Sequence, residues 1–585
     1  RASRPQAASV SLDAGAPAGT AAACGRDARA PMFVVALLLT LTASAETFGP
    51  VVIEPRTGVA MMRDGTYYEY RFNVFNPTAE PHAVRIDITG SGIGDRQPRS
   101  SRTVVVAPQT SSLVSIPQYV MEQYAPREAL IFVDGAAEEK LPLGSHFQGS
   151  SYRTARDLLL GRTVNDVLPA EAAAEDSGLV AIRPAVSPAS WSANWIHYTG
   201  FAAILLTPAD WNELARPVQI ALLRYVAAGG TLTFVGGQPA GLPVMRQITD
   251  FAPLVPAAAH GFGWVTLAPA KIDAETLEIF KAAWRVSELD RYQWAADPMT
   301  ATPVPLLEDA SLPLKSLFSL LVVFAVIGGP VNLGVLAKKQ KRLWIFWTLP
   351  LLGIITAVIL VGSVIVSEGW VRVQKTTSLT LLDERSGEAA TIGWTGFYST
   401  LAPDGEVRFD SGTEVRPLFV AGEAHTDWTD GQRFVSGWIG SRLPRSFVVR
   451  KVEPRRERLP VRREGGHLVA INGLGANVRE LWVAEADGTA WVARDVAAGK
   501  EVVLTRAPNK VDPAIKDPAN ILTAPSMWGT LQARFAKDPR TALRAGSYVA
   551  VIERSPFVEL ALARPSKTSS DAVVIGIMKG IDDAS

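Results

Sequence analysis

Polar residues and glycines directly follow two apolar runs near the middle of this 585-residue chain. Thr207 and Asp210 come after "AAILL", and Gly236, Gly237 and Gln238 come after "TLTFV". The carboxyl ends of parallel strands meet at one edge of an open α/β sheet, where such sheets bind ligands. Backbone N–H groups in "GGQPAG" could receive an anion there, but the spacing of a phosphate loop is absent. The alternative is that these residues cap helices and shape loops, and both interpretations stay open.

The residue types that commonly do thiol or metal chemistry are scarce. Cys24 is the only cysteine, so an intrachain disulfide or a thiolate metal site is excluded. The histidines show no pair at ligand spacing, and they are His82, His146, His197, His260, His425 and His467. We therefore predict no metal site and no cofactor.

Three tryptophans cluster in the sequence around the same apolar runs, at Trp191, Trp195 and Trp211. Such rings could form a platform for a sugar or a contact surface for another protein. Packing at the edge of a core is the commoner role of aromatic residues near a sheet.

Residues 149–295 alternate short apolar runs with helical patterns. Strands are predicted at "RDLLLGR", "GLVAIRP", "AAILLT", "TLTFVGG" and "GFGWVTLA". One long helix is predicted over "PADWNELARPVQIALLRYVAAGG", and others near "DVLPAEAAAE" and over "DAETLEIFKAAWRV". The apolar face of the long helix is expected to consist of Leu214, Val218, Ala221, Leu222, Tyr225 and Val226. Repeated units of this kind predict a doubly wound parallel sheet.

This part of the chain, especially "YTGFAAILLTPADW" leading into "ALLRYVAAGGTLTFVGG", resembles the class I glutamine amidotransferase-like version of the flavodoxin fold. That version recurs in an uncharacterised family of bacterial inner-membrane proteins, joined to a β-sandwich, two closely spaced spans and a β-rich tail. Active members of the class carry a nucleophilic cysteine and a downstream His-x-Glu pair. Here no cysteine follows Cys24, and the residues two after His197 and His260 are Thr199 and Phe262. The resemblance thus implies the fold and argues against the chemistry, because a thiolate nucleophile needs a thiol.

Residues 46–148 are predicted to form an immunoglobulin-like β-sandwich. The stretch "TYYEYRFNVFNPT" alternates in the manner of a strand. One face carries Tyr68, Tyr70, Phe72 and Val74, and the other carries Glu69, Arg71 and Asn73. Further strands are predicted in "HAVRIDITG", "RTVVVAPQT" and "SSLVSIP". Such modules usually bind or space other domains.

Two uncharged segments, residues 316–337 and 343–367, are each long enough to cross a bilayer core of about 30 Å as a helix. Between them, residues 338–342 contain Lys338, Lys339, Lys341 and Arg342. Cations concentrate in cytoplasmic loops, so we expect this loop to face the cytoplasm and both flanking parts to lie in the periplasm.

Within these segments, kinks or close helix packing are expected at Gly328, Gly329, Pro330, Asn332 and Pro350. The Asn332 side chain could bond to a neighbouring helix, or to Thr348 or Thr356 of the second segment. Neither segment contains an ionisable residue, so packing is favoured over an ion or proton site.

The N-terminal residues 1–45 are predicted to be a disordered leader followed by a signal peptide. Met32 is an alternative start, and "FVVALLLTLTASA" after it is too short for a spanning helix. Its small-residue ending predicts cleavage after Ala45. A buried helix or a retained anchor is the alternative.

The remaining parts are a proline-rich linker, residues 296–315, and a β-rich periplasmic domain, residues 368–585. A hairpin is predicted around Asp487-Gly488, and a helix over "SMWGTLQARFAKD". The cations of "RKVEPRRERLPVRR" could touch lipid head groups or an acidic partner, or lie on a solvated hairpin.

The formal net charge of +1 provides no field for nucleic-acid binding, and the mean hydropathy of +0.14 favours membrane segments. We expect a non-enzymatic scaffold or sensor for partner proteins, anchored in the lipid bilayer of the bacterial inner membrane. Two alternatives are a periplasmic hydrolase acting on cell-wall or sugar substrates in the α/β crevice, and an accessory subunit of a membrane transporter.

Overall fold

The computed structural model describes residues 45–583, apart from several internal segments. The segments outside the description are residues 57, 60–64, 89–97, 121–127, 137–138, 144–155, 165–166, 170–178, 185, 243–245, 248–255, 282–283, 285–313, 369–371, 404, 406, 418–423 and 509–542. The predicted signal peptide, the linker up to residue 313 and the helix over 526–538 therefore lie outside the described residues. So does most of the helix expected near 166–175.

The first sheet near the N-terminus is antiparallel, with the order β1-β2-β3-β6. Its strands are β1 (Glu46–Phe48), β2 (Val51–Arg56), β3 (Tyr67–Phe75) and β6 (Ser111–Tyr119). Alternate residues of β3, such as Phe72 and Val74, are buried in a core shared with Val84 and Ile86 of a second sheet. The first two sheets thus share one apolar core.

The second sheet combines strands from distant parts of the chain, in the order β18-β21-β20-β5-β4-β7-β8. Four come from the N-terminal part: β4 (His82–Ile88), β5 (Arg99–Val106), β7 (Glu128–Val133) and β8 (Glu139–Pro142). Three come from the C-terminal part: β18 (Val407–Phe409), β20 (His425–Asp427) and β21 (Gln432–Ser436). The link is the parallel pairing of β20 with β5, in which Thr426 lies opposite Ser100. One sheet therefore joins residues that precede and follow the expected membrane segments.

The α/β unit contains a seven-stranded sheet, in the order β10-β9-β11-β12-β15-β14-β13. Its strands are β9 (Arg156–Leu160), β10 (Leu179–Ile182), β11 (Ala203–Leu206), β12 (Thr231–Val235), β13 (Arg246–Gln247), β14 (Pro256–His260) and β15 (Gly263–Ala268). The first five in the order are parallel, and β14 and β13 are antiparallel. When the five parallel strands are numbered along the chain, their order across the sheet is 2-1-3-4-5, which is also the order of flavodoxin-like sheets.

Helices cover both faces of this sheet. Helix α2 (Arg216–Ala227) packs on the face that carries Leu159 and Ile204. Residues 274–281 are helical and supply Phe280 to a core on the opposite face. Successive strand residues point to opposite faces, so a strand covered on both sides is apolar throughout.

The single helix expected over residues 208–228 is wrong, because the structure has two helices there. Helix α1 (Pro208–Glu213) is capped by Leu214, and α2 begins at Arg216. Pro217 has no N–H and its ring clashes with the carbonyl four residues earlier, which kinks or breaks a helix unless the proline lies in the first turn. Here the chain breaks the helix and starts a new one just before Pro217.

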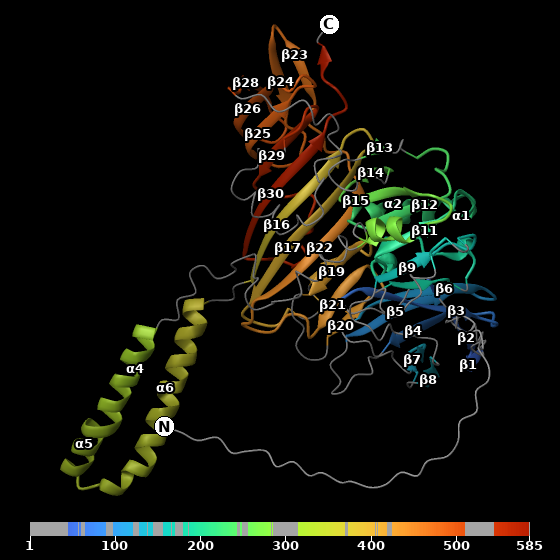
Figure 1. The fold of residues 1–585 in the computed structure, drawn as a ribbon. Helices are drawn as coiled ribbons and strands as arrows, with labels where there is room; N and C mark the ends of the chain where they lie inside the picture. The colour runs from blue at the N-terminus through green and yellow to red at the C-terminus, as the bar shows by residue number, and fades with distance from the viewer. Residues whose placement is uncertain are drawn as a thin grey trace, which may run out of the picture. The chain divides into compact units, whose positions relative to one another are not determined.

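The C-terminal part is built on a nine-stranded sheet, in the order β19-β22-β17-β16-β30-β29-β25-β26-β28 (Figure 1). Its strands are β16 (Arg372–Asp383), β17 (Glu388–Ser399), β19 (Thr413–Pro417), β22 (Arg445–Pro454), β25 (Val478–Ala484), β26 (Ala490–Val496), β28 (Thr505–Arg506), β29 (Ser547–Ile552) and β30 (Lys567–Ile577). Only β16 and β30 pair in parallel among these strands. The predicted hairpin at Asp487-Gly488 is confirmed, since it joins β25 to β26.

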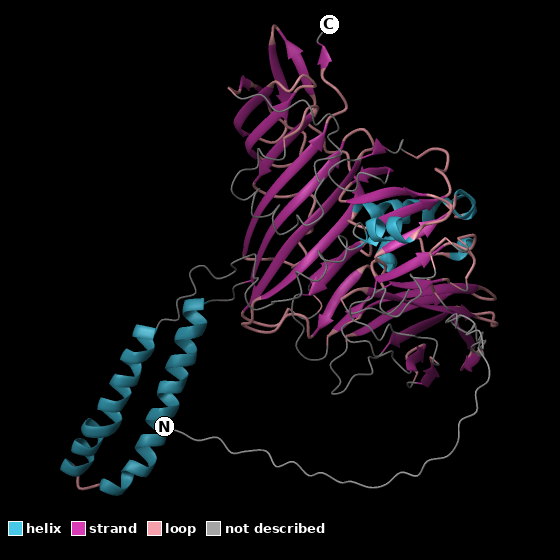
Figure 2. Ribbon diagram, in the orientation of Figure 1, coloured by secondary structure: helices cyan, strands magenta, loops and turns pink. Residues whose placement is uncertain are grey.

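A smaller sheet follows, in the order β27-β24-β23-β31. Its strands are β23 (Val461–Glu464), β24 (His467–Ile471), β27 (Glu501–Val503) and β31 (Asp582–Asp583). The described residues thus form a multi-sheet α/β protein in which strands dominate (Figure 2).

The expected membrane segments form two helical stretches that lie side by side (Figure 1). The first consists of α4 (Leu314–Val326), a π-helical turn η5 (Ile327–Val331) and α5 (Asn332–Lys338). After the 3₁₀ turn η6 (Arg342–Trp344), the second is α6 (Ile345–Glu368).

Among the described residues, one helical stretch is long and apolar enough to cross a membrane, Phe318–Lys338, with a mean hydropathy of 2.3. The apolar stretch Ile345–Ile359 of α6 is too short to meet the same requirement for length. The α6 backbone as a whole has 24 residues, which at a rise of about 1.5 Å each makes about 36 Å. Most large apolar side chains on both stretches are exposed, for example Phe318 and Val358.

Candidate functional site

The edge at which β9 and β11 end is the topological switch point of the α/β sheet, because β10 and β12 lie on opposite sides of this pair. Thr207 follows β11 and is the N-cap of α1. Its Oγ1 accepts a hydrogen bond from the Asp210 N–H at 3.1 Å, and Asp210 Oδ2 accepts one from the Thr207 N–H at 3.1 Å. Two backbone donors that a helix start leaves open are thereby satisfied.

The same aspartate also holds the loop that follows β9. Asp210 Oδ1 accepts a hydrogen bond from the Thr163 N–H at 2.9 Å, and the Thr163 and Thr207 hydroxyls bond to each other. A Cβ added to Gly161 would lie 2.2 Å from Asp210 Oδ2, so only glycine lets the carboxylate approach this closely. Asp210 is fully buried and both of its oxygens accept bonds from this chain. Thr207 and Asp210 therefore hold together the start of α1 and the loop after β9 at the switch point.

The other three predicted residues form the loop after β12. Gly236 and Gly237 have φ angles of 78° and 156°, and the Gln238 Nε2 donates to the Leu242 carbonyl at 3.1 Å. Gly237 lies beside α1, since an added Cβ would be 3.7 Å from Pro208 Cγ. The structure thus brings all five predicted residues to one edge of the sheet, as the strand order requires. Gln238 is exposed there.

A second cluster, buried between β3 and the segment before β11, was not predicted. Glu69 and Arg71 on β3 are 3% and 6% exposed, and their side chains pair at 2.8 Å. They face His197 in the 3₁₀ helix η4 (Trp195–Tyr198), with Glu69 Oε1 3.2 Å from His197 Nδ1. The alternation of β3 predicted that Glu69 and Arg71 share a face, but it could not show that the α/β unit covers that face.

This cluster contains serine, histidine and glutamate, the residue types of a hydrolytic triad, but in a different geometry. Ser192 Oγ lies 2.7 Å from His197 Nδ1, the ring nitrogen that also faces Glu69. In a triad the nucleophile and the acid bond to different ring nitrogens, so that a proton can pass between them. All three side chains here are almost fully buried. The cluster therefore holds β3 against η4.

Electrostatics support that structural role. Burial alone would raise the pKa of Glu69, but the charge and hydrogen bonding of His197 and Arg71 outweigh it and lower the pKa to about 2. Arg71 Nη1 also donates to the Ser190 carbonyl at 2.6 Å, and the Ser115 hydroxyl donates to Glu69 at 2.7 Å. Removing one partner of a buried ion pair is destabilising, because the other charge is then left buried and unpaired.

The α/β unit is also bonded to the nine-stranded sheet. Trp195 Nε1 donates to the Gly412 carbonyl at 2.8 Å, and Asn194 Nδ2 donates to the Ser411 carbonyl at 3.0 Å. Arg450 Nη1 on β22 donates to the Ala228 carbonyl, at the end of α2, at 3.0 Å. The three tryptophans that could have formed a sugar platform are 3–4% exposed, so they pack in the interior.

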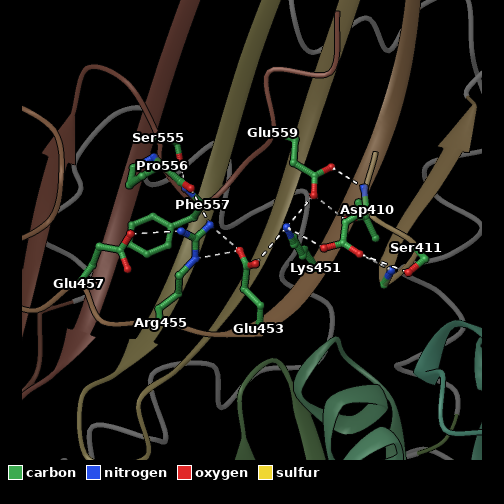
Figure 3. A network of polar contacts seen from close by, with 12 residues as sticks. Asp410, Ser411, Lys451, Glu453, Arg455, Glu457, Ser555, Pro556, Phe557 and Glu559 are labelled. Atoms are coloured by element: carbon green, nitrogen blue, oxygen red, sulfur yellow. Dashed lines mark hydrogen bonds and ion pairs between the residues drawn. The ribbon is translucent and has the colours of Figure 1, made fainter. Parts of the chain in front are cut away.

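The loop that contains Ser411 and Gly412 is also held by a network of polar contacts around Lys451 (Figure 3). Lys451 Nζ lies 2.6 Å from Glu559, 3.0 Å from Glu453 and 3.9 Å from Asp410. Glu559 in turn accepts hydrogen bonds from the Asp410 N–H at 3.3 Å and the Thr413 hydroxyl at 3.0 Å. The Lys451 network thus fixes residues 410–413, to which Asn194 and Trp195 bond.

The surroundings of Lys451 exclude a nucleophilic role. Burial alone would lower its pKa, but Glu559 and Glu453 outweigh this effect and raise the pKa, so the ammonium form is kept. A catalytic lysine needs the opposite shift.

Other cations of "RKVEPRRERLPVRR" are also neutralised within the chain. Arg455 pairs with Glu453 at 2.5 Å and with Glu457 at 3.1 Å, and its guanidinium lies 5.3 Å from the centre of the Phe557 ring (Figure 3). Further pairs join Arg450 to Glu414, Arg462 to Glu464 and Glu501, and Arg463 to Glu485. These ion pairs stabilise the fold of the C-terminal part.

Two of the predicted packing residues, Gly328 and Asn332, lie against α6 in the helical pair. Asn332 Nδ2 donates to Thr348 Oγ1 at 2.9 Å, which is one of the bonds expected from the sequence. A Cβ on Gly328 would lie 3.3 Å from Leu349 and from Leu352 of α6, whereas one on Gly329 would meet nothing within 4 Å. Pro330 lies inside the π-helical turn, where the regular helix is interrupted. Pro350 lies within α6, which continues past it.

The predicted topology residues form the turn between the two helical stretches. Lys338 ends α5, Arg342 begins η6, and the side chains of Lys338, Lys339 and Lys341 are exposed. Lys341 Nζ lies 5.2 Å from the centre of the Trp344 ring, a cation–π distance.

Within the described ranges, no group of three or more histidine, cysteine, aspartate or glutamate side chains is arranged to hold a metal ion.

Comparison with known proteins adds little. No known protein-family profile matches the chain, and no curated protein does. Two solved structures of a yeast domain are weakly similar. The delta-COP-I mu-homology domain bound to a Dsl1 WxWxV peptide has a TM-score of 0.19 and 7% identity, covering 35% of this chain and 95% of that one. The unbound domain gives a TM-score of 0.19 and 6% identity, covering 36% and 97%. Similarity this low supports no inference about function.

Proposed function

We propose that this protein is a non-enzymatic scaffold of the bacterial inner membrane, which presents its β-rich body to partner proteins on the periplasmic side. The helical pair crosses the bilayer twice, with the cationic turn in the cytoplasm. The α/β unit is a degenerate member of the class I glutamine amidotransferase-like fold and acts as a structural part of the body.

The observation that carries this proposal is the pairing of β5 with β20. Ser100 precedes the helical pair and Thr426 follows it, yet they are neighbours in one sheet. Two parts of a chain that share a sheet lie on the same side of any bilayer between them. The helical pair then crosses an even number of times, which supports a hairpin of two spans over a single crossing by Phe318–Lys338.

The exposed turn supports the orientation. Lys338, Lys339 and Lys341 belong to the short loop between the helices, and short loops rich in cations stay on the cytoplasmic side. A loop of this length holds no domain, so any signal from the body reaches the cytoplasm through a partner or through the helices themselves.

The bonding of Asp210 supports a scaffold over a hydrolase. Asp210, the acidic residue predicted at that edge, caps α1 and holds the loop after β9. A general acid or base must be free to exchange a proton with a substrate, and the Asp210 carboxylate is buried and bonded to Thr163 and Thr207. The 2-1-3-4-5 strand order supports the resemblance in fold alone.

The proposal is tested by exchanging the helical pair. Residues 314–368 are replaced with an unrelated two-span hairpin, and tagged wild-type and exchanged chains are purified in mild detergent from the native bacterium. We expect both to retain the same partner, identified by mass spectrometry and confirmed by tagging the partner. The body then carries the binding surface.

If the exchanged chain loses the partner and the wild type keeps it, binding belongs instead to the helices, as in a transporter accessory subunit. A hydrolytic activity towards cell-wall or sugar substrates that is lost in Asp210→Asn, with the fold retained, would replace the scaffold with the enzyme.

A further inference from the structure

Four neighbouring strands of the nine-stranded sheet begin or end close together at one end of the sheet: β22, β17, β16 and β30. Arg445 on β22 lies opposite Phe397 on β17, and Ser399 on β17 lies opposite Arg372 on β16. The first residue of β30, Lys567, lies opposite the second residue of β16. We refer to this edge and its adjoining turns, residues 399–403, 440–445 and 563–567, as the sheet end.

The sheet end is tied closely to the helical pair by the chain itself. Helix α6 ends at Glu368 and β16 begins at Arg372. Four successive Cα–Cα steps of about 3.8 Å span at most about 15 Å. If α6 ends at the bilayer surface, Arg372 at the sheet end lies within that distance of the lipid head groups.

Two large apolar side chains are exposed in the turns of the sheet end. Leu401 is 51% exposed and Leu443 is 50% exposed. They belong to turns that are bonded to each other, since the Arg442 N–H donates to the Ser399 carbonyl at 2.7 Å and the Ser441 hydroxyl to the Thr400 carbonyl at 3.1 Å. Their exposure is therefore a property of a fixed part of the sheet.

The described charged residues of the same turns are all basic, while Asp404 and Glu406 nearby lie outside the described residues. Arg442 and Arg564 are exposed and have φ angles of 59° and 51°. Few residues other than glycine adopt this left-handed region, which costs roughly 1 kcal/mol or more. The chain thus places arginine at two tight turns where glycine would be less strained. Lys567, three residues after Arg564, is also exposed.

We propose that the sheet end is a membrane-contact surface for an anionic phospholipid bilayer. Leu401 and Leu443 enter the interfacial layer, and Arg442, Arg564 and Lys567 face the lipid phosphates. Each cation at such a surface contributes favourably, and apolar side chains add burial. This inference rests on the proposed crossing of the bilayer by α6, and it fixes the body against the periplasmic leaflet in one orientation.

The test uses the full chain in nanodiscs containing phosphatidylglycerol. In a Cys24→Ser background, Leu401→Cys and Leu443→Cys are labelled with an environment-sensitive fluorophore, and lipids carrying a nitroxide on the head group are added as quencher. Two control positions share the exposure but lie farther along the structure: Ser569→Cys on β30 and Val503→Cys on β27. We expect strong quenching at positions 401 and 443, weaker quenching at 569, and none at 503.

The charge component is tested with the double substitution Arg564→Gln and Lys567→Gln. This variant should reduce quenching at position 443 to the level that the parent shows in zwitterionic phosphatidylcholine discs. Equal quenching in both lipids for the parent would remove the anionic part of the proposal.

A label at Ile355→Cys in α6, quenched by a nitroxide on the lipid acyl chain, distinguishes a failure of the contact surface from a failure of the membrane hairpin. Quenching at 355 without quenching at 401 and 443 would overturn the contact surface and leave the membrane hairpin intact. No quenching at 355 would overturn the hairpin, and the contact surface with it.

Discussion

Glu69 Oε1 and His197 Nδ1 lie 3.2 Å apart in the interior, where strand β3 meets the 3₁₀ helix η4 of the α/β unit. The residues are separated by more than a hundred positions in the sequence, and Arg71 completes the group. A charged group of this kind is stable only when all its members are present. It therefore makes the contact between the first sheet and the α/β unit sensitive to protonation.

Acid should weaken this contact over a defined pH range. The pKa of Glu69 in the folded protein is about 2, below its ordinary value of 4.5, so its contribution is complete above about pH 4.5 and is lost as the pH falls towards 2. The shift corresponds to about 3 kcal/mol. Unfolding midpoints of the wild type and Glu69→Gln, measured between pH 2 and 7, should converge as the pH falls. A constant difference across that range would contradict the assigned pKa.

Adding one methyl group at the switch point should destabilise the α/β unit. Gly161→Ala places a Cβ against the Asp210 carboxylate, and overpacking of this kind costs about 1–3 kcal/mol. Gly412→Ala is the matched control, because its Cβ would meet only Asp410 Oδ1, at 3.9 Å. Thermal unfolding should show a lower midpoint for Gly161→Ala alone. Equal midpoints would mean that Asp210 can move aside, and that the crevice can open.

Two adjacent glycines should respond differently to the same substitution. Gly328→Leu directs its side chain at Leu349 and Leu352 of α6, whereas Gly329→Leu points away from the helical pair. Hydrogen–deuterium exchange of residues 345–359 in detergent should therefore rise in Gly328→Leu and stay unchanged in Gly329→Leu. A rise in both variants would show that the glycines matter for the helix backbone rather than for packing.

The pairing of β5 with β20 can be trapped covalently. Ser100→Cys and Thr426→Cys, in the Cys24→Ser background, place two thiols on directly opposite residues of a parallel pair, within the usual range for a disulfide. We expect a disulfide after mild oxidation of membranes, detected as a shift in gel mobility that reductant reverses. Pairing Ser100→Cys with Ser569→Cys provides the control. Failure of the first pair to cross-link would place the two parts of the chain apart.

Much of the architecture could be predicted, because local patterns encode it. The β3 residues alternate Tyr70, Phe72 and Val74 with polar side chains, and the strand forms where that period requires. The apolar runs of the α/β unit became five parallel strands for the same reason. The break before Pro217 was predictable from its missing N–H, but the apolar period on both sides of it favoured one helix.

The features that were not predicted depend on contacts between distant residues. Glu69 and Arg71 have the pattern of a solvent-facing edge, and only the position of His197 explains their burial. Strand β20 (His425–Asp427) has three residues and no apolar alternation, so its pairing with β5 left no local signal. Asp210 was expected at the correct edge, but its bonds to Thr163 could not be read from spacing.

The pairing of β5 with β20 also limits the order in which the chain can fold during synthesis. Ser101 and His425, which bond at 2.8 Å in this sheet, are 324 positions apart. During synthesis, β5 is made early, and its edge stays without β20 until the two helical stretches and a further segment have been made. An open strand edge of this kind invites aggregation. Chains that stall or end before residue 425 would therefore leave the β5 edge unpaired, and we expect such incomplete chains to aggregate more readily than the full chain.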